Sequence, residues 1–212
     1  MAAVSVARAE EIDLAVSFVK TTGLRLLLPD LLDALTRDAA ETRPPARVRI
    51  LTSDYLDITD PEALRLLMLL AEQGAMVRVF EARGASFHMK AYLFAHFPEP
   101  RGLHGTAFIG SSNISRQALT DGLEWNYRVD YPGDDGFLEA RVRFEEVFRD
   151  VRTVELTDQW IEQYEARRIP PPRAIAPGSE ETEPPPAPTP IQVEALDALA
   201  ATRREGYRRG VV

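Results

Sequence analysis

The sequence predicts an α/β protein with a mixed sheet flanked by helices, forming a single domain that is followed by a proline-rich linker and a terminal helix. Strand-type and helix-type hydrophobic patterns alternate twice, and three further strand-like segments then follow. Apolar residues make up 45% of the chain and charged residues 27%, which suffices for one buried core. The composition changes sharply after Ile169, where prolines become frequent.

The first part of the chain alternates strands and helices. Apolar residues alternate with polar or small ones over residues 12–19, which predicts a half-buried strand. Leucines recur at spacings of three and four over residues 24–35, as on the apolar face of a helix. A second strand begins at Val48, after two prolines. Residues 59–62 (Thr-Asp-Pro-Glu) are typical of a helix start, and we expect that helix to continue to Glu72.

The later part is predicted to contain mainly strands. Residues 77–80, 106–109 and 123–130 each have a strand-like pattern, and a short helix is expected between the last two. Residues 137–148 fit an amphipathic helix. Strands thus come to outnumber helices, which favours a mixed rather than a purely parallel sheet.

One further strand is predicted to carry polar side chains of chemical interest. Residues 87–94 alternate, so His88, Lys90 and Tyr92 are expected on the face opposite Phe87, Met89 and Ala91. The motif Gly110-Ser111-Ser112-Asn113 follows the next strand, and its glycine permits close backbone approach at the strand end.

These residue types match the needs of phosphodiester chemistry. A phosphodiester requires a nucleophile near phosphorus, cationic donors for the non-bridging oxygens, and small hydroxyl or amide donors. We expect His88 to act as nucleophile or acid, Lys90 and Asn113 to hold phosphate, and Ser111 or Ser112 to support them. This set needs no metal ion, so none is predicted.

Glu124 is a fourth candidate, because a carboxylate among apolar neighbours requires a partner. We expect it to accept the Nδ1 proton of His88, which would fix the imidazole tautomer and steady its positive charge. The alternative is an ion pair with a neighbouring arginine. His88 and Lys90 also have a plainer interpretation as a strand histidine beside a surface lysine, and Ser111 and Asn113 as caps of the following helix.

The residues resemble the motif of the phospholipase D superfamily, which reads His-x-Lys, four residues, Asp, and then a Gly-Ser-x-Asn segment. The match consists of His88-Met89-Lys90 and residues 110–113, with Glu124 placed as in single-motif bacterial nucleases of that superfamily. The resemblance covers residues 10–150 and implies a phospholipase-D-like sheet. Ala95 stands where the family usually has the aspartate that supports the site.

The resemblance also implies a mechanism and a partner. One histidine attacks phosphorus to give a phosphohistidine, and a second protonates the leaving oxygen and then activates water. With one His-x-Lys motif in the chain, the second histidine is expected to be the partner's His88 in a two-fold homodimer. His96 and His104 are weaker candidates for an internal substitute. We therefore expect a metal-independent DNA nuclease that needs no cofactor.

A second resemblance concerns the C-terminus, where Gln192 and the residues from Gly210 are similar to the lead-in of superfamily 2 helicase motors. No phosphate-binding G-x-x-x-x-G-K-[ST] loop is present. The expected organisation is a nuclease-like domain over 1–168, a linker over 169–190 and the truncated start of a motor over 191–212. ATP and Mg²⁺ would be needed only by the missing motor.

The composition limits which kinds of site, location and partner the protein can have. The chain has no cysteine, which excludes thiolate sites, and it has only three histidines. No apolar run is long enough for a membrane span. We expect a cytoplasmic protein with DNA as partner and no membrane contact. The net charge of −8 does not favour nucleic acid, but net charge does not describe the field in one cleft.

Other interpretations stay open. A degenerate site could bind DNA phosphates and guide the helicase without cleavage, and a lipid phosphodiesterase is a further alternative. Candidate nucleic-acid contacts are Lys20, Thr22, Ser53 and Tyr55, although such residues often only cap turns. Trp125 and Trp160 are predicted to pack in the core rather than to stack on bases.

Overall fold

The computed structural model describes residues 6–37, 44–100 and 102–169, together with Val193, Asp197, Ala198, Ala200 and Ala201. The chain divides into two compact units, Met1–Pro170 and Pro171–Val212, and each is described by itself. In the second unit the described residues are helical and exposed, as expected for a helix over 191–201. The linker after Ile169 and the motor-like segment from Gly210 lie outside the described residues.

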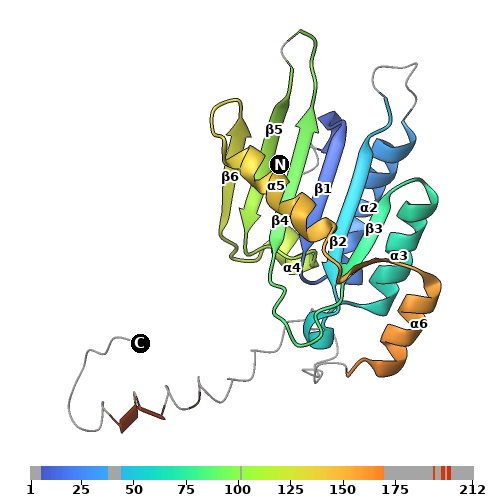
Figure 1. The fold of residues 1–212 in the computed structure, drawn as a ribbon, viewed down its shortest axis with the longest axis vertical. Coiled ribbons are helices and arrows are strands. Elements are labelled where there is room, and N and C mark those ends of the chain that lie inside the picture. Colours follow the sequence, from blue (N-terminus) through green and yellow to red (C-terminus); the bar gives the residue numbers. More distant parts are fainter. Residues whose placement is uncertain are drawn as a thin grey trace. The chain divides into compact units, whose positions relative to one another are not determined.

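The first unit is built on a seven-stranded mixed sheet with the order β6-β5-β4-β1-β2-β3-β7 (Figure 1). In chain order the strands are β1 Glu11–Val16, β2 Arg47–Ser53, β3 Met76–Phe80, β4 Lys90–His96, β5 His104–Gly110, β6 Asn126–Tyr131 and β7 Thr153–Glu155. β1, β2 and β3 are parallel, and the remaining neighbouring pairs are antiparallel. The predicted mixed α/β class is therefore confirmed.

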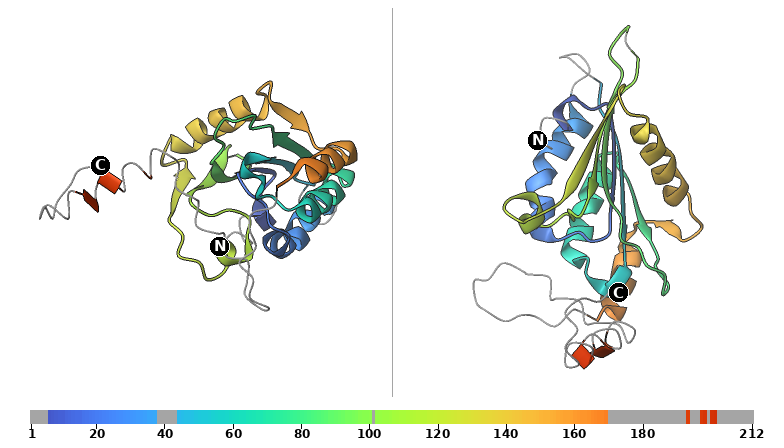
Figure 2. Two further views of the ribbon diagram at one scale, coloured as in Figure 1. Left: turned by 90° about the horizontal axis from the view of Figure 1, so that it is seen from below. Right: turned by 90° about the vertical axis from the view of Figure 1, so that its left-hand side faces the viewer.

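Helices cover both faces of this sheet. They are α2 Thr21–Thr36, α3 Pro61–Glu72, α4 Arg116–Leu119, α5 Gly136–Phe148 and α6 Asp158–Arg167, with a short 3-10 helix η1 at Tyr55–Asp57. Figure 2 (right) shows the sheet nearly edge-on, with α2 and α3 on one side and α5 on the other. α2 and α3 are the crossovers that parallel strands require.

The larger core lies between the sheet and α2, α3 and α6. Its fully buried members include Leu14, Leu24, Ile50, Leu67 and Tyr164. On the opposite face, α5 contributes Phe137, Phe144 and Phe148 to two smaller clusters. The spacing of these phenylalanines places them on one side of α5, which crosses the sheet diagonally (Figure 1).

An ion-pair network fastens α5 to the middle of the sheet. Arg49 of β2 donates to both oxygens of Asp13 at 2.7 and 2.8 Å and to Glu145 of α5 at 2.5 Å. Burial alone would lower the pKa of Arg49, but its bonds to Asp13 and Glu145 outweigh burial and raise that pKa. The guanidinium also lies over the rings of Phe144 and Phe148, at 4.8 and 5.1 Å from their centroids.

The predicted element ends differ from the structure mainly at one end of the sheet. β1 ends at Val16 instead of residue 19, because the chain there turns away and Val19 pairs with Ile114. Residues 87–89 therefore precede β4, which corrects the prediction that His88 lies within a strand. The predicted faces are confirmed, since Phe87 and Met89 pack on the α5 side and Tyr92 on the α2 side.

Candidate functional site

The candidate site forms where the chain after β1 meets the loop after β5. The Asn113 side-chain oxygen accepts a hydrogen bond from the Phe18 amide at 3.2 Å. The Ile114 amide donates to the Phe18 carbonyl at 3.3 Å, and the Lys20 amide donates to the Ile114 carbonyl at 2.7 Å. These bonds hold the Gly-Ser-Ser-Asn loop against the end of β1. Asn113 is 7% exposed, and its amide nitrogen carries two N–H donors besides the oxygen that Phe18 uses.

Two glycines allow this close packing. A Cβ at Gly110 would lie 2.0 Å from the carbonyl oxygen of Trp125, and a Cβ at Gly23 would lie 2.5 Å from the backbone of Ser115. Because these neighbours are backbone atoms, they cannot move aside as a flexible side chain could. The glycine of the loop motif is therefore required by packing as well as suited to the site.

His88, just before β4, and Lys90, its first residue, both lie against Phe18. Lys90 is 5% exposed; its Nζ donates to the His88 carbonyl at 3.5 Å and lies 5.7 Å from the centroid of the Phe18 ring. His88 is exposed, and its ring meets the Phe18 ring edge-on at 6.0 Å. Tyr55 stacks on the same ring at 6.2 Å.

Phe18 is thus the residue around which His88, Lys90 and Asn113 gather, and sequence reasoning missed it. Its ring contacts the first two, and its backbone bonds to the third. The sequence offers only a weak signal, because Phe18 continues the alternation of the preceding strand.

Ser112 belongs to the buried support of the loop. It is 5% exposed, its Oγ accepts from Nδ2 of Asn126 at 2.7 Å, and its carbonyl accepts from the Tyr92 hydroxyl at 2.9 Å. Burial, followed by the negative charge of Glu124, raises the pKa of Tyr92 well above its ordinary value. The phenol is therefore kept protonated as a donor to the loop.

Glu124 lies in the loop before β6, not on the strand predicted over 123–130. Its carboxylate accepts a hydrogen bond from the Ser111 hydroxyl, and the Ser111 oxygen accepts from the Trp125 amide at 2.9 Å. The structure therefore joins Glu124 to the loop through Ser111. Its expected bond to His88 stays a prediction.

The other two histidines lie at the opposite end of the sheet. His96 and His104 face each other across β4 and β5, with ring centroids 5.3 Å apart. Lys90 begins β4 and His96 ends it, a separation of roughly 20 Å along an extended strand. Neither histidine can reach a phosphate held beside Lys90 in the same chain.

Ala95 is explained by its surroundings. It is 3% exposed and packs with Leu93, Ala107, Val129 and Phe137 beneath α5. An aspartate here would need a partner in this apolar cluster. The alanine therefore suits the packing of α5.

The four candidate nucleic-acid contacts differ in accessibility. The Lys20 ammonium is held by Asp60 at 3.3 Å and by the Ile58 carbonyl at 2.9 Å, and the Ser53 hydroxyl donates to the Ser17 carbonyl at 3.0 Å. Contact of Lys20 or Ser53 with DNA would require these bonds to break. Tyr55 is partly buried and Thr22 is exposed, so their predicted role stays open.

The two tryptophans have opposite environments. Trp160 is 8% exposed and packs in the larger core, as predicted, whereas Trp125 is 87% exposed, so its predicted burial is wrong. Trp125 precedes β6, at an end of the sheet where Tyr127 is also exposed, and the pattern of the sequence does not show that α5 leaves this end uncovered.

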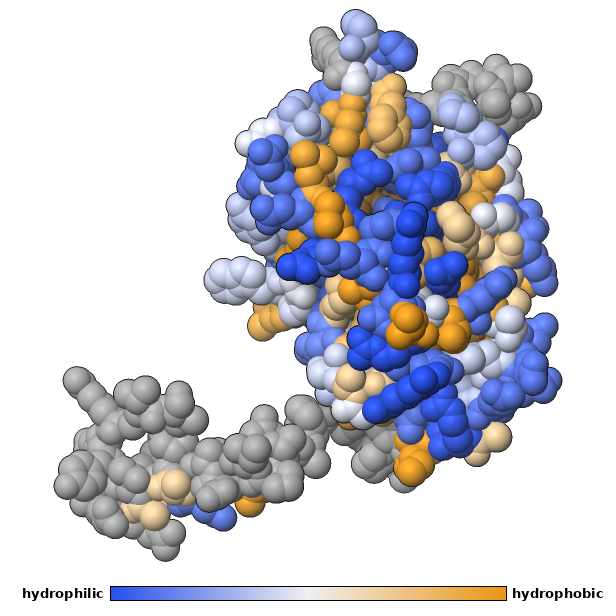
Figure 3. Space-filling model, in the orientation of Figure 1, coloured by the Kyte–Doolittle hydropathy of each residue, from blue (hydrophilic) through white to orange (hydrophobic). Residues whose placement is uncertain are grey.

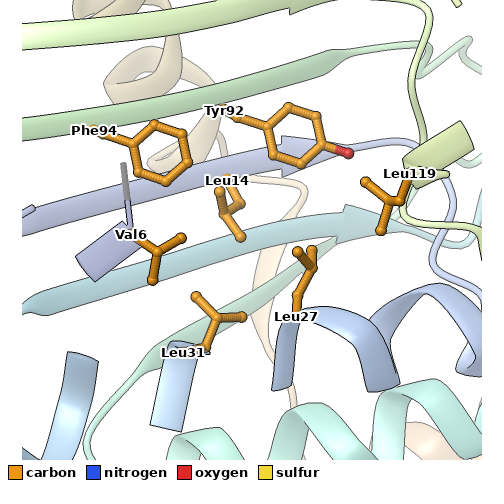
Figure 4. Close-up of a pocket in the computed structure, with 7 residues that line it drawn as sticks. All are labelled: Val6, Leu14, Leu27, Leu31, Tyr92, Phe94 and Leu119. Carbon is orange, nitrogen blue, oxygen red and sulfur yellow. The ribbon is translucent and has the colours of Figure 1, made fainter. Parts of the chain in front are cut away.

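A small apolar cavity of about 20 Å³ lies between α2 and the sheet. Figure 4 shows that it is surrounded by side chains of Val6, Leu14, Leu27, Leu31, Tyr92, Phe94 and Leu119. Its lining offers no charged group, so we interpret it as a packing gap. Among the residues that the structure describes, no three or more His, Cys, Asp or Glu side chains gather as a metal site would require.

The fold and the site together define a class: a mixed α/β domain in which histidine, lysine and asparagine converge beside the carboxyl ends of parallel strands, as suits phosphoester binding. A family model described as "Cardiolipin synthase, PLD-like domain" matches residues 5–150. The chain belongs to this phospholipase-D-like family, as its motifs predict.

Comparison with individual proteins gives less information than the family model. No curated protein matches the chain. Among solved structures, the polyphosphate kinase from Porphyromonas gingivalis superposes with a TM-score of 0.46 and 16% identity. The match covers 69% of this chain but 23% of that kinase. In the described part of the chain, no helix combines the length and hydropathy that crossing a bilayer requires.

Proposed function

We propose that this domain is a metal-independent phosphodiesterase that cleaves DNA through a phosphohistidine on His88. The observation that carries the proposal is the convergence of exposed His88, buried Lys90 and the Asn113 amide around Phe18. A nucleophile open to solvent beside fixed donors for phosphate oxygens is what attack on a phosphodiester requires.

The proposed reaction has two displacements. In the first, Nε2 of His88 bonds to phosphorus, the bond from phosphorus to one DNA oxygen breaks, and that oxygen takes a proton from the partner's His88. In the second, the partner's His88 takes a proton from water, whose oxygen bonds to phosphorus as the phosphorus–nitrogen bond breaks. Lys90 and Asn113 stabilise charge on the non-bridging oxygens. Glu124 is proposed to orient His88, since one carboxylate can accept more than one hydrogen bond.

The proposal includes two partners. A second copy of the chain supplies the second histidine, because His96 and His104 lie at the far end of β4 and β5. The domain is further proposed to serve a DNA helicase motor in the same polypeptide, on the resemblance of the residues after Pro190. ATP and Mg²⁺ belong to that motor.

Two other functions have specific support. Ala95, at the position where the family usually has aspartate, favours a module that binds DNA phosphates without cleaving them. The description of the matched family names cardiolipin synthase, which favours phospholipid chemistry. Against the second, hydrophilic residues cover most of the middle of the face that carries α5, which gives no broad membrane-binding surface there (Figure 3).

Cleavage assays in EDTA test the proposal. We expect the purified protein to cleave DNA, His88→Ala to lose about 10³-fold or more of that activity, and His104→Ala to retain it as a matched histidine control. Quenching with denaturant at alkaline pH during turnover should trap DNA joined covalently to His88, because the phosphorus–nitrogen bond is labile in acid but not in base. DNA that is bound but never cleaved would support the binding module instead. Turnover of phosphatidylcholine without DNA cleavage would support the lipid enzyme.

A further inference from the structure

The α5 side of the sheet has an uncovered corner next to the site. In the row formed by Leu93, Ala107 and Val129, all three side chains are buried beneath Phe137. In the next row toward the site, Ile109 is 39% exposed and Tyr127 is 63% exposed. The chain before β6 then adds Leu123 and Trp125, which are 105% and 87% exposed. We call Ile109, Leu123, Trp125 and Tyr127 the open corner.

Hydrogen bonds hold the backbone of the open corner against the candidate site. The Ser111 amide donates to the Trp125 carbonyl at 3.1 Å, and the Trp125 amide donates to the Ser111 hydroxyl at 2.9 Å. Tyr127 is held in register opposite Ile109 on β5. The backbone of both aromatic residues is therefore held immediately beside the loop proposed to bind phosphate.

We propose that Trp125, with Tyr127 beside it, is a stacking platform for an unpaired base of the DNA substrate. The inference rests on the proposed function, because it requires a nucleic-acid phosphate at the adjacent loop. Bases in a duplex are already stacked, so an exposed aromatic side chain reaches a base face only in single strands or at opened ends. The site consequently prefers single-stranded DNA.

The chemistry of the corner favours a base over other occupants. The phosphate is proposed to lie at Lys90 and Asn113, and the Glu124 carboxylate, which accepts from Ser111 and precedes Trp125, disfavours a second phosphate at Trp125 but not the face of a base. A stable interface between two copies of the chain buries about 20–30 residues a side. The open corner has only four apolar side chains, interrupted along the chain by Glu124, Asn126 and Arg128, so it is too small to form the proposed dimer contact by itself.

Binding measured without cleavage tests this inference separately from the reaction. In His88→Ala, labelled oligothymidine should bind more tightly than a duplex of equal length, and the second substitution Trp125→Ala should weaken oligothymidine binding about tenfold. Phe97→Ala is the matched control, since Phe97 is an exposed aromatic residue beyond the opposite end of β4, and it should leave binding unchanged. Oligothymidine should also quench tryptophan fluorescence, and Trp125→Ala should abolish the quenching because Trp160 is buried.

The outcomes are distinguishable. Equal binding of oligothymidine by the Trp125→Ala and Phe97→Ala variants overturns the platform, whether or not the native chain cleaves DNA. If Trp125→Ala instead converts a dimer to a monomer, the open corner is an interface between copies and the platform is again wrong. Quenching that depends on Trp125 in a protein that never cleaves DNA would leave the platform standing and remove the proposed nuclease.

Discussion

Two buried tyrosines each donate a hydrogen bond from the phenol hydroxyl to a backbone carbonyl, one beside the candidate site and one in the larger core. Tyr92 donates to the Ser112 carbonyl at 2.9 Å, and Tyr164 donates to the Thr59 carbonyl at 2.9 Å. Burial is the main cause that raises the pKa of both phenols, so each remains a donor near neutral pH. Tyr92 supports the proposed phosphate-binding loop, whereas Tyr164 joins α6 to the segment before α3.

This pair gives a matched prediction. Tyr92→Phe and Tyr164→Phe should each lower the free energy of unfolding by about 1–2 kcal/mol, because each leaves a buried carbonyl without its partner. Only Tyr92→Phe should also lower the rate of DNA cleavage, by about tenfold, since the loop beside Asn113 is loosened. Urea unfolding and cleavage assays measure the two effects. Equal cleavage by the two variants would show that the loop does not depend on Tyr92.

At the scale of single residues, the sequence predicts the polar residues of the proposed reaction but not the apolar residue that they contact. His88, Lys90 and Asn113 are recognisable because their spacing matches a motif. Phe18 is not, because an alternating pattern cannot show that the strand ends two residues earlier and that the next residues turn toward Asn113.

At the scale of elements, α5 depends on charge as well as on its apolar face. Glu145 accepts from Arg49 across the helix–sheet contact, and this bond is the main cause that lowers the pKa of Glu145 below its ordinary 4.5. A carboxyl group whose pKa is lower in the folded chain stabilises the fold above the unfolded-chain pKa. That contribution is lost as the pH falls through the folded-chain value.

Glu145→Gln should therefore destabilise the protein at pH 7, and its difference from the native chain should shrink as the pH falls below about 4.5. Denaturant midpoints at several pH values measure this difference. Glu146→Gln is the matched control: Glu146 pairs with Arg143 on the exposed side of α5, where an ion pair contributes little. A Glu145→Gln difference that stays constant from pH 7 to pH 3 would contradict the interpretation.

The elements that the sequence does not predict are β7, α6 and the 3-10 helix η1. β7 has three residues, too few for alternation to be visible. α6 buries Trp160, Ile161 and Tyr164 but is otherwise polar, so its helical pattern is sparse. The longer α2, α3 and α5 are predicted closely because each repeats its apolar spacing over several turns.

At the scale of the whole molecule, the length of the sheet separates His88 from the other two histidines. His88 precedes β4 at the proposed site, and His96 and His104 stand at its other end. The first unit thus brings one histidine to the site, whereas the proposed reaction uses two. Activity is therefore predicted to belong to a pair of chains rather than to one.

Mixing experiments test this prediction. When native and His88→Ala chains are mixed equally and allowed to exchange, random pairing leaves about one quarter of the dimers with two His88 residues. The cleavage rate per total protein should then fall to about one quarter of the native rate, because mixed pairs lack either the nucleophile or the acid. Subunit exchange is checked independently with fluorescently labelled chains. A rate of about one half after full exchange would mean that each chain acts alone, and the second proton donor would have to be a group other than histidine.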